Sequence, residues 1–367
     1  MEQGYLETRD LSVGYHGQPL IRDLNFSLEK GEILSLIGPN GAGKTTILKH
    51  IIRQMKPLGG AVWLDGKNLG GYSGPQLARK MSVVLTRRVR PELMSCRDVV
   101  STGRYPYTGR FGVLTERDLM AVERAMEMVH ITDLAERDFS RISDGQKQRV
   151  MLARAICQEP EVIVLDEPTA YLDIRHKIDL LDILRTMARE KKISVVMSLH
   201  EIDLAVKVSD KLLCVGGNGE TTFGTPRQIL AACPIDRLYS LEKGSYDPLF
   251  GSVELVKPEG TPEVFVVAGA GCGIPVYRQL QKNRTPFAAG ILFENDVDYQ
   301  VAKVLSDHVV SVPAFLPMTQ AHYCAAAALL ESCHTVIDAG APVGELNMEN
   351  RRLLALAAEK GIPIRRV

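Results

Sequence analysis

The stretch that decides the fold runs Ile33-Leu34-Ser35-Leu36-Ile37-Gly38-Pro39-Asn40-Gly41-Ala42-Gly43-Lys44-Thr45-Thr46. Its first five residues are mostly apolar and predict a buried parallel strand. The segment from Gly38 through Thr45 matches the pattern G-x-x-x-x-G-K-[ST], and a helical pattern over Thr46–Gln54 follows it. Glycines let backbone N–H groups wrap a polyphosphate, and the helix N-terminus adds the positive end of its dipole. The stretch therefore predicts a loop that binds nucleotide phosphates.

Two side chains of this loop add chemistry that the backbone lacks. Lys44 can reach the β- and γ-phosphates of a nucleoside triphosphate. The hydroxyl of Thr45 can bind Mg²⁺. We therefore expect Lys44 to take part in catalysis and Thr45 to be a metal ligand.

A second apolar run, Val162–Leu165, ends in two carboxylates, Asp166 and Glu167. This is the Walker B arrangement, in which a strand delivers acidic groups to the edge of a sheet. Asp166 is expected to hold Mg²⁺, and Glu167 is expected to orient or deprotonate the attacking water as general base.

A second anion site is expected where Ser143-Asp144-Gly145-Gln146 begins a helical pattern. Ser143 and the backbone N–H groups near Gly145 lie at the start of that helix. One chain with two phosphate-binding helix starts suggests that the second serves the nucleotide of another subunit.

Composition limits the classes of protein that the chain can belong to. Its 367 residues predict about two domains. Lys plus Arg and Asp plus Glu are 44 each, which argues against a protein that mainly coats nucleic acid. The seven cysteines are scattered without a C-x-x-C pair, so neither a disulfide framework nor a zinc site is expected. No signal peptide is expected, and the apolar stretches fall short of the ~20 residues of a membrane-spanning helix.

The chain divides into two α/β regions. Residues 1–240 alternate buried strands with helices, as a mostly parallel sheet requires. The glycine- and proline-rich stretch 241–260 is interpreted as a connection. Residues 261–367 predict a smaller, Rossmann-like parallel domain. Its expected strands and helices are Val264–Ala268, Ala288–Phe293, His308–Val312, Thr335–Asp338 and Ile362–Ile364, and Val276–Lys282, Val297–Leu305, Gln320–Ser332 and Met348–Glu359.

Together these motifs resemble those of the ATP-binding cassette (ABC) ATPases over about residues 5–230, in the order that the family has. Ser143–Gln146 is similar to the family's signature sequence, LSGGQ, and Ala170–Asp173 resembles its D-loop. His200, after the apolar run Val195–Leu199, resembles the switch histidine, and Tyr15 resembles the aromatic residue that stacks on adenine. The resemblance implies a P-loop NTPase fold of ABC type, with a mixed sheet and a helical subdomain at about 87–150.

The resemblance also implies how the site works. Each ATP, with Mg²⁺, would lie between the P-loop of one subunit and the Ser143 segment of a second copy. Lys44, Glu167 and His200 would act in catalysis, and Thr45, Asp166 and Thr86 would serve the metal. The nucleotide-contacting set implied is Tyr15, Gly38, Pro39, Asn40, Gly41, Ala42, Gly43, Lys44, Thr45, Thr46, Ser143, Gly145, Gln146 and Asp173.

Two positions depart from the family pattern. Thr86 stands where the Q-loop usually carries glutamine, so its shorter hydroxyl would reach the metal or the water only indirectly. Asp144 stands where the signature usually has glycine, and a carboxylate there is expected to point away from a γ-phosphate.

Two further segments favour one transporter class. Thr169–His176 resembles the T-S-x-L-D-I-x-H of importers for iron–siderophore, haem and cobalamin, and Gly103–Tyr107 resembles their G-R-x-P-Y. This implies a peripheral ATPase on the cytoplasmic face of the membrane, with separate permease subunits and a substrate-binding protein. A soluble ABC ATPase of DNA repair or translation, or an exporter ATPase, is the alternative; nucleic acid is not an expected partner.

The C-terminal region leaves several roles open. Gly269-Ala270-Gly271-Cys272-Gly273 follows its first strand, but the spacing is not that of a dinucleotide fingerprint and no lysine follows. Glu294-Asn295-Asp296 and Asp338-Ala339-Gly340 end two other strands at the edge where ligands bind in open α/β sheets. The domain could mediate dimer contact, sense a small ligand or catalyse a reaction, and Cys272 could be a reactive thiol or an inert one.

Overall fold

The computed structural model describes residues 4–85, 93–109, 111–232, 235–248 and 250–367. These residues form two compact units, Met1–Leu241 (unit 1) and Glu242–Val367 (unit 2). Each unit has its own sheets and its own apolar core.

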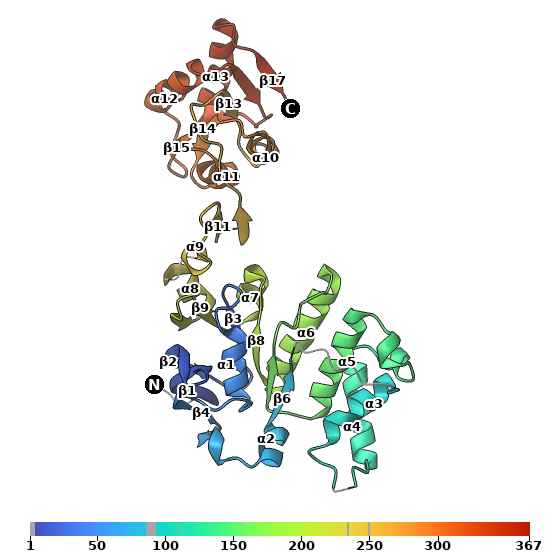
Figure 1. Ribbon diagram of the computed structural model, residues 1–367. Helices are drawn as coiled ribbons and strands as arrows, with labels where there is room; N and C mark the ends of the chain where they lie inside the picture. The colour runs from blue at the N-terminus through green and yellow to red at the C-terminus, as the bar shows by residue number, and fades with distance from the viewer. Residues whose placement is uncertain (1–3, 86–92, 110, 233–234, 249) are drawn as a thin grey trace. The chain divides into compact units, whose positions relative to one another are not determined.

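Unit 1 is built on a six-stranded sheet in the order β10-β9-β3-β8-β7-β6 (Figure 1). The strands are β3 (Ile33–Ile37), β6 (Met81–Val84), β7 (Val162–Leu165), β8 (Ser194–Ser198), β9 (Lys211–Val215) and β10 (Thr221–Gly224). All neighbours in this sheet run parallel except β9 and β10. Every residue of β3, β7 and β8 is buried, as in a parallel sheet covered on both faces.

A second, antiparallel sheet lies in the N-terminal part of unit 1, in the order β2-β1-β4-β5. Its strands are β1 (Leu6–Tyr15), β2 (Gln18–Leu28), β4 (Gly59–Leu64) and β5 (Lys67–Asn68). Apolar residues of β1, β2 and β4 share one core with those of β3 and of helix α1 (Lys44–Ile51). The remaining helices of the strand-rich part are α2 (Gly74–Lys80), α6 (Ile174–Lys191), α7 (Ile202–Val208), α8 (Pro226–Ala232), α9 (Ile235–Leu238) and the 3₁₀ turn η1 (Leu69–Gly71).

A helical segment lies between β6 and β7. Its longer helices are α3 (Cys96–Ser101), α4 (Glu116–Met128) and α5 (Asp144–Cys157), with 3₁₀ turns η2 (Thr102–Arg104), η3 (Thr132–Leu134) and η4 (Phe139–Arg141). The three helices pack on one another, and α5 also packs on β6. Each begins with a capping box, whose N-cap residues are Ser95, Thr115 and Ser143, so the sequence itself sets where these helices start.

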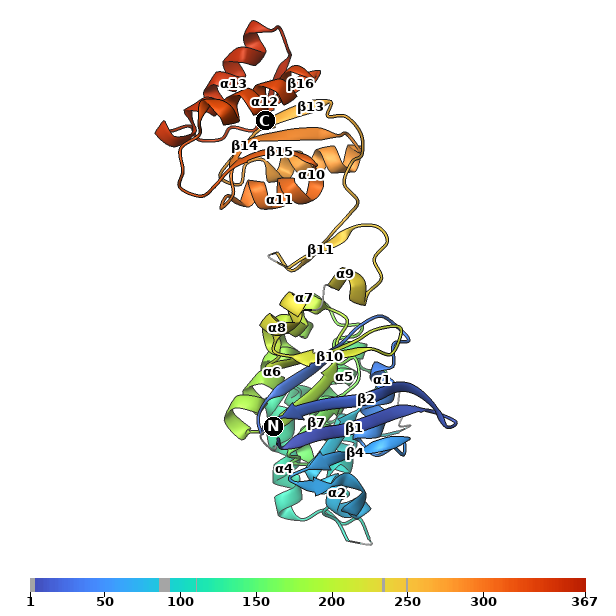
Figure 2. The same cartoon turned by 90° about the vertical axis from the view of Figure 1, so that its left-hand side faces the viewer.

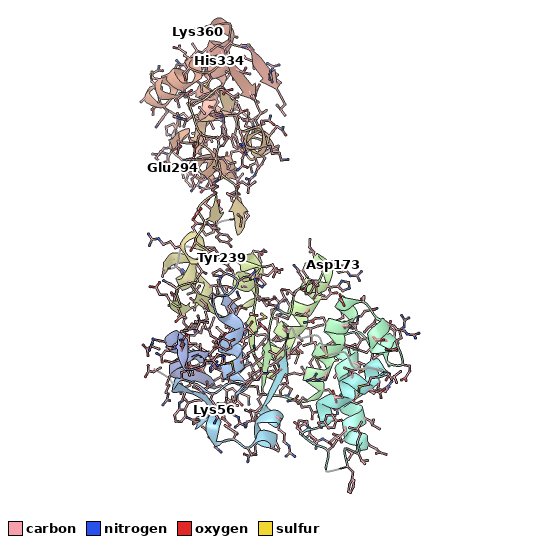
Figure 3. All side chains as sticks on the ribbon, viewed as in Figure 1. Lys56, Asp173, Tyr239, Glu294, His334 and Lys360 are labelled. Carbon is pink, nitrogen blue, oxygen red and sulfur yellow. The ribbon has the colours of Figure 1, made fainter. Side chains whose placement is uncertain are left out.

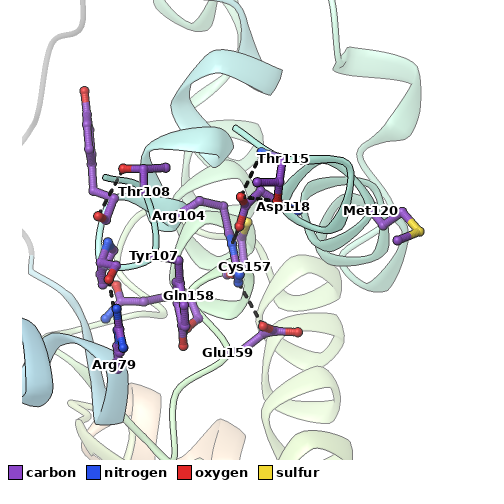
Figure 4. A network of polar contacts seen from close by, with 12 residues as sticks. Arg79, Arg104, Tyr107, Thr108, Thr115, Asp118, Met120, Cys157, Gln158 and Glu159 are labelled. Carbon is purple, nitrogen blue, oxygen red and sulfur yellow. Dashed lines mark hydrogen bonds and ion pairs between the residues drawn. The ribbon is translucent and has the colours of Figure 1, made fainter. Parts of the chain in front are cut away.

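The helical segment is held by a buried ion pair of Arg104, whose side chain is only 2% exposed (Figure 4). Its guanidinium donates to Asp118 of α4 at 2.8 Å, and to the carbonyl of Cys157 and the carboxylate of Glu159 beyond α5. The neighbouring ring of Tyr107 lies against the same guanidinium, 4.0 Å away. Thr115 and then Arg104 lower the pKa of Asp118 to about 2, so this pair is charged at neutral pH.

Unit 2 is a doubly wound sheet of five parallel strands in the order β15-β14-β13-β16-β17 (Figure 2). The strands are β13 (Val264–Val267), β14 (Phe287–Phe293), β15 (His308–Val312), β16 (Thr335–Asp338) and β17 (Ile364–Arg366). Helices α10 (Ile274–Asn283) and α11 (Val297–Leu305) cover one face, and α12 (Gln320–Glu331) and α13 (Met348–Glu359) cover the other. This strand order places the topological switch between β13 and β16.

The predicted elements agree closely with those observed, with small differences at their ends. Strands β3 and β7 have the predicted bounds, whereas β17 begins two residues later than predicted. Strand β1 begins at Leu6, and its N-terminal half pairs with both β2 and β4. The stretch 241–260, interpreted as a connection, contains a hairpin of β11 (Ser245–Asp247) and β12 (Ser252–Glu254), whose Glu254 pairs with Arg278 of α10.

No helix in the described part of the chain combines the length and the apolar character that crossing a bilayer requires.

Replacing Arg104 with alanine should lower the free energy of unfolding by about 3–5 kcal/mol, because Asp118 would stay buried without its cation. Urea unfolding followed by circular dichroism measures the change. Arg117→Ala, on the exposed side of the same region, is the control and should cost less than about 0.5 kcal/mol. Equal losses in the two variants would contradict a special role for the buried pair.

Candidate functional site

The phosphate loop lies between β3 and α1, at the carboxyl edge of the central sheet. Gly38 has φ +147°, and a Cβ on it would lie 2.1 Å from the carbonyl oxygen of Val215 on β9. Gly43, with φ +108°, is the N-cap residue of α1 and has no side chain to bond to the first N–H groups of the helix. The loop can therefore take this path only with glycine at both places. Because the N-cap residue is glycine, no N-cap side chain accepts from the first N–H groups of α1.

Lys44 is 5% exposed and lies inside this loop. Its ammonium donates to the carbonyl oxygens of Gly38 at 2.6 Å and Pro39 at 2.9 Å. Burial lowers the pKa of Lys44, while the carboxylates of Glu167 and Asp166 act in the opposite direction. The ammonium of Lys44 is therefore already inside the loop, where phosphate oxygens could replace the two carbonyl oxygens as its hydrogen-bond acceptors.

The two predicted metal residues that the structure describes lie together. The hydroxyl of Thr45 donates to both oxygens of Asp166, at 3.1 and 3.0 Å. A hydroxyl and a carboxylate at this separation form the all-oxygen donor set that Mg²⁺ prefers, so the residues present fit that ion. Thr86, the third predicted metal residue, lies outside the described residues.

The predicted general base and switch histidine contact each other. His200 Nε2 lies 2.8 Å from Glu167 Oε1. Glu167 has φ +50°, a left-handed backbone that residues other than glycine seldom adopt. The left-handed backbone of Glu167 sets the direction of its carboxylate, which contacts the imidazole of His200 just after β8.

Tyr15 lies beside the P-loop helix. The residue is 43% exposed, and its hydroxyl is 2.9 Å from the hydroxyl of Thr46 on α1. Both features suit the expected stacking on a base whose phosphates occupy the loop. The other loop residues, Asn40, Gly41 and Ala42, complete the turn between β3 and α1.

The Ser143 segment begins α5, which packs on α3, α4 and β6. Ser143 is exposed and caps the helix through the N–H of Gln146, at 3.3 Å. A Cβ on Gly145 would lie 3.4 Å from Leu172, so this turn and the D-loop approach each other. Asp144 is exposed and forms an ion pair with Lys147 at 3.5 Å, in keeping with a carboxylate held by its own helix.

Asp173 lies at the start of α6 (Figure 3). It caps this helix and accepts from the N–H of His176 at 2.9 Å. That backbone bond lowers its pKa, and the imidazole of His176 adds to the effect. The structure therefore gathers the predicted residues of the P-loop, the Walker B strand and His200 at one sheet edge, while Ser143, Gly145, Gln146 and Asp173 lie at the starts of two other helices.

Two residues near the Walker B strand were not predicted. Ser198 donates to Asp166 at 2.8 Å and accepts from the N–H of Glu167 at 2.8 Å. Glu201 accepts from Thr169 and Lys177 beside the D-loop. The signal for Ser198 is a single hydroxyl in an apolar strand, two residues before His200.

Unit 2 also has a glycine-rich strand–loop–helix turn, at the start of α10. Here the buried carboxylate of Asp298, from α11, accepts from the N–H groups of Gly273 and Ile274 at 3.1 Å. Asp296 accepts from the N–H of Ala270 at 2.7 Å. The position that a phosphate takes in dinucleotide-binding folds is thus filled by the chain's own anion.

The same turn is closely packed. A Cβ on Gly273 would lie 2.6–2.7 Å from Ala268 and from the ring of Tyr277. The thiol of Cys272 donates to the carbonyl oxygen of Gly269, and burial raises its pKa. A thiol with a raised pKa is a poor nucleophile, so this geometry favours an inert Cys272.

The fold and site described define a P-loop ATPase. The family model described as "ABC transporter" matches residues 21–170, and that of the "MJ0874 family" matches residues 287–367. The "Uncharacterized ABC transporter ATP-binding protein MJ0873" of Methanocaldococcus jannaschii is 42% identical over 288 residues, 78% of this chain and 99% of its own. The chain therefore belongs to the ATP-binding proteins of ABC transporters and is an ABC-type ATPase.

Two further relatives carry more specific names. The "Cobalamin import ATP-binding protein BtuD" of Halobacterium salinarum is 32% identical over 84% of this chain and 79% of its own. Unit 1 ends at residue 241 of 367, so that match includes part of unit 2. Among solved structures, "An inward-facing conformation of a putative metal-chelate type ABC transporter" has a TM-score of 0.57 and 29% identity over 64% of this chain and 88% of its own.

Lys44→Ala should raise the dissociation constant for ATP by about ten- to a hundredfold, because charge-assisted contacts to the phosphates are lost. Equilibrium dialysis with labelled ATP measures it, and Lys49→Ala on the same helix should leave the affinity unchanged.

The wild-type chain should bind one ATP per chain, since Asp298 fills the corresponding position in unit 2. A second site that survives in the Lys44→Ala variant would contradict this.

Proposed function

We propose that this protein is the ATP-hydrolysing subunit of an importer for an iron–siderophore, haem or a corrinoid, working through separate permease subunits. The observation that carries the proposal is the contact between His200 and Glu167 beside the P-loop, in a chain whose relatives are named for siderophore transport and cobalamin import. An exporter-type or soluble ABC ATPase with a ligand-sensing C-terminal domain is the alternative.

The residues at the sheet edge divide the work of hydrolysis. The P-loop N–H groups and Lys44 bind the phosphates. Thr45 and Asp166 would hold Mg²⁺, which would neutralise phosphate charge when bound. Glu167 takes a proton from the attacking water as the water oxygen bonds to the γ-phosphorus. The bond from phosphorus to the bridging oxygen breaks, giving ADP and phosphate. His200 holds the carboxylate of Glu167 and contacts the γ-phosphate.

A second copy completes the site. Ser143 uses its oxygen to accept from Gln146, which leaves its O–H free to donate to a phosphate oxygen of the partner's nucleotide. Asp144 forms an ion pair with Lys147, which partly neutralises its charge and so reduces its repulsion of that phosphate. Asp173 and the exposed ring of Tyr171 lie on the D-loop, from which the two sites would be coupled. Thr86 would act on the metal or the water from the Q-loop.

We assign residues 1–240 to the ATPase domain, with a helical subdomain at about 87–150 that would meet the permease. The protein would then lie at the cytoplasmic face of the membrane, and a substrate-binding protein would deliver cargo to the permease. Residues 241–260 would connect it to a C-terminal domain at 261–367 with a regulatory or dimerisation role. The filled turn at α10 supports a role without nucleotide binding for that domain.

Glu167→Gln should lower kcat at least about a hundredfold, because the amide cannot take the proton of the water. ATP binding should persist, so the variant should elute as an ATP-dependent dimer in size-exclusion chromatography. It should also copurify from membranes with a permease of many helices. Glu190→Gln, at an exposed position, is the control. Wild-type hydrolysis by Glu167→Gln would refute the general base, and copurification with ribosomes or DNA would refute the importer.

A chain that ends at Leu241 should lose either dimer stability or the normal rate of ATP hydrolysis, because it lacks all of unit 2. Ending there removes the β11–β12 hairpin together with its partner Arg278, so unit 2 is not divided. ATPase assays, analytical ultracentrifugation and uptake in membrane vesicles measure the effect. Unchanged values in all three would contradict the regulatory or dimerisation role.

A further inference from the structure

The last residue of β8, Ser198, links the two acidic residues that follow β7. Its side chain is fully buried. Its hydroxyl donates to Asp166 Oδ1 and accepts from the backbone N–H of Glu167, both at 2.8 Å. A hydroxyl can donate one hydrogen bond while it accepts another, so this one side chain satisfies both contacts at once.

The contact to Glu167 matters because of the backbone at that residue. At φ +50° the Cβ of an L-residue is crowded, so neighbouring contacts must hold the conformation. The N–H of Glu167 has Ser198 as its acceptor, and the side chain of Glu167 has His200 as its partner at 2.8 Å. The direction of the carboxylate is therefore set at two points, both supplied by the end of β8 and the residues after it.

We infer that Ser198 is a positioning residue of the ATPase, which keeps Glu167 in its left-handed conformation and its carboxylate aimed at the attacking water. Without the hydroxyl, the N–H of Glu167 loses its acceptor and the backbone can relax toward an ordinary conformation. The inference rests on the proposed role of Glu167 as general base. Ser198 itself need touch neither nucleotide nor water, so its loss affects turnover rather than nucleotide binding.

The strand offers a matched control. Ser194 begins β8, is equally buried, and also bridges two groups: its hydroxyl donates to the carbonyl of Glu29 and accepts from the N–H of Gly31. Ser194→Ala and Ser198→Ala thus each remove one buried bridging hydroxyl from the same strand. They differ in that only Ser198 contacts the acidic pair.

The test is steady-state ATP hydrolysis by the full-length chain. Ser198→Ala should lower kcat by about ten- to a hundredfold with less than a twofold change in KM for ATP, as expected for a displaced catalytic group. Ser194→Ala should keep the wild-type kcat, and Ser198→Thr, which retains the hydroxyl, should recover most of the loss. A wild-type kcat for Ser198→Ala, or equal losses in the two alanine variants, would overturn the inference.

A double-mutant comparison shows whether Ser198 acts through Glu167. In single-turnover assays on Glu167→Gln protein, adding Ser198→Ala should change the residual rate less than twofold, because no carboxylate base remains to be positioned. The same loss in both backgrounds would overturn the inference, as would recovery of Ser198→Ala by excess Mg²⁺, which would point to Asp166 instead. Wild-type hydrolysis by Glu167→Gln alone would refute the general base and not the effect of Ser198.

Discussion

The parallel alignment of β3, β8 and β7 is the constraint on which the site depends. Because the three strands run side by side in one direction, their carboxyl ends open on the same sheet edge. Side chains from the three ends then bond to one another: Thr45 and Ser198 both to Asp166, and His200 to Glu167. A slip of one residue in any strand would turn these groups to the opposite face, so the catalytic geometry and the register of the sheet are set together.

Features with a local pattern could be predicted from the sequence, and features made by distant contacts could not. The apolar runs of β3 and β7 predicted those strands with their observed bounds, because both lie in a fully buried sheet. The carboxyl groups of Asp166 and Glu167 were found because they end such a run. Ser198 was missed because its partners lie 31 and 32 residues away in the chain. The apolar pattern of a strand shows that a serine within it is unusual, but it does not show which groups that serine contacts.

Two of the described non-glycine residues with a left-handed backbone lie where the chemistry is expected. Glu167 and Tyr171 both have a positive φ, at +50° and +61°, and they flank the turn from the Walker B strand into the D-loop. The contacts of Ser198 and of Glu201 hold this turn from the neighbouring strand end. Because several contacts hold this strained turn, its side chains keep one arrangement. A carboxylate that acts as general base depends on such a fixed arrangement.

The N-termini of α1, α5 and α10 differ in the side chains beside them, and these side chains determine whether the N-terminus can bind a phosphate. Gly43 begins α1 without a side chain, so the dipole end and the nearby Lys44 remain available to an external anion. Ser143 caps α5 but keeps a donor hydrogen, so that start can still bind a phosphate oxygen supplied by another chain. At α10 the carboxylate of Asp298 supplies the negative charge from within. Both units therefore have a glycine-rich turn between a strand and a helix, and the buried aspartate in unit 2 is why we expect only the turn of unit 1 to bind nucleotide.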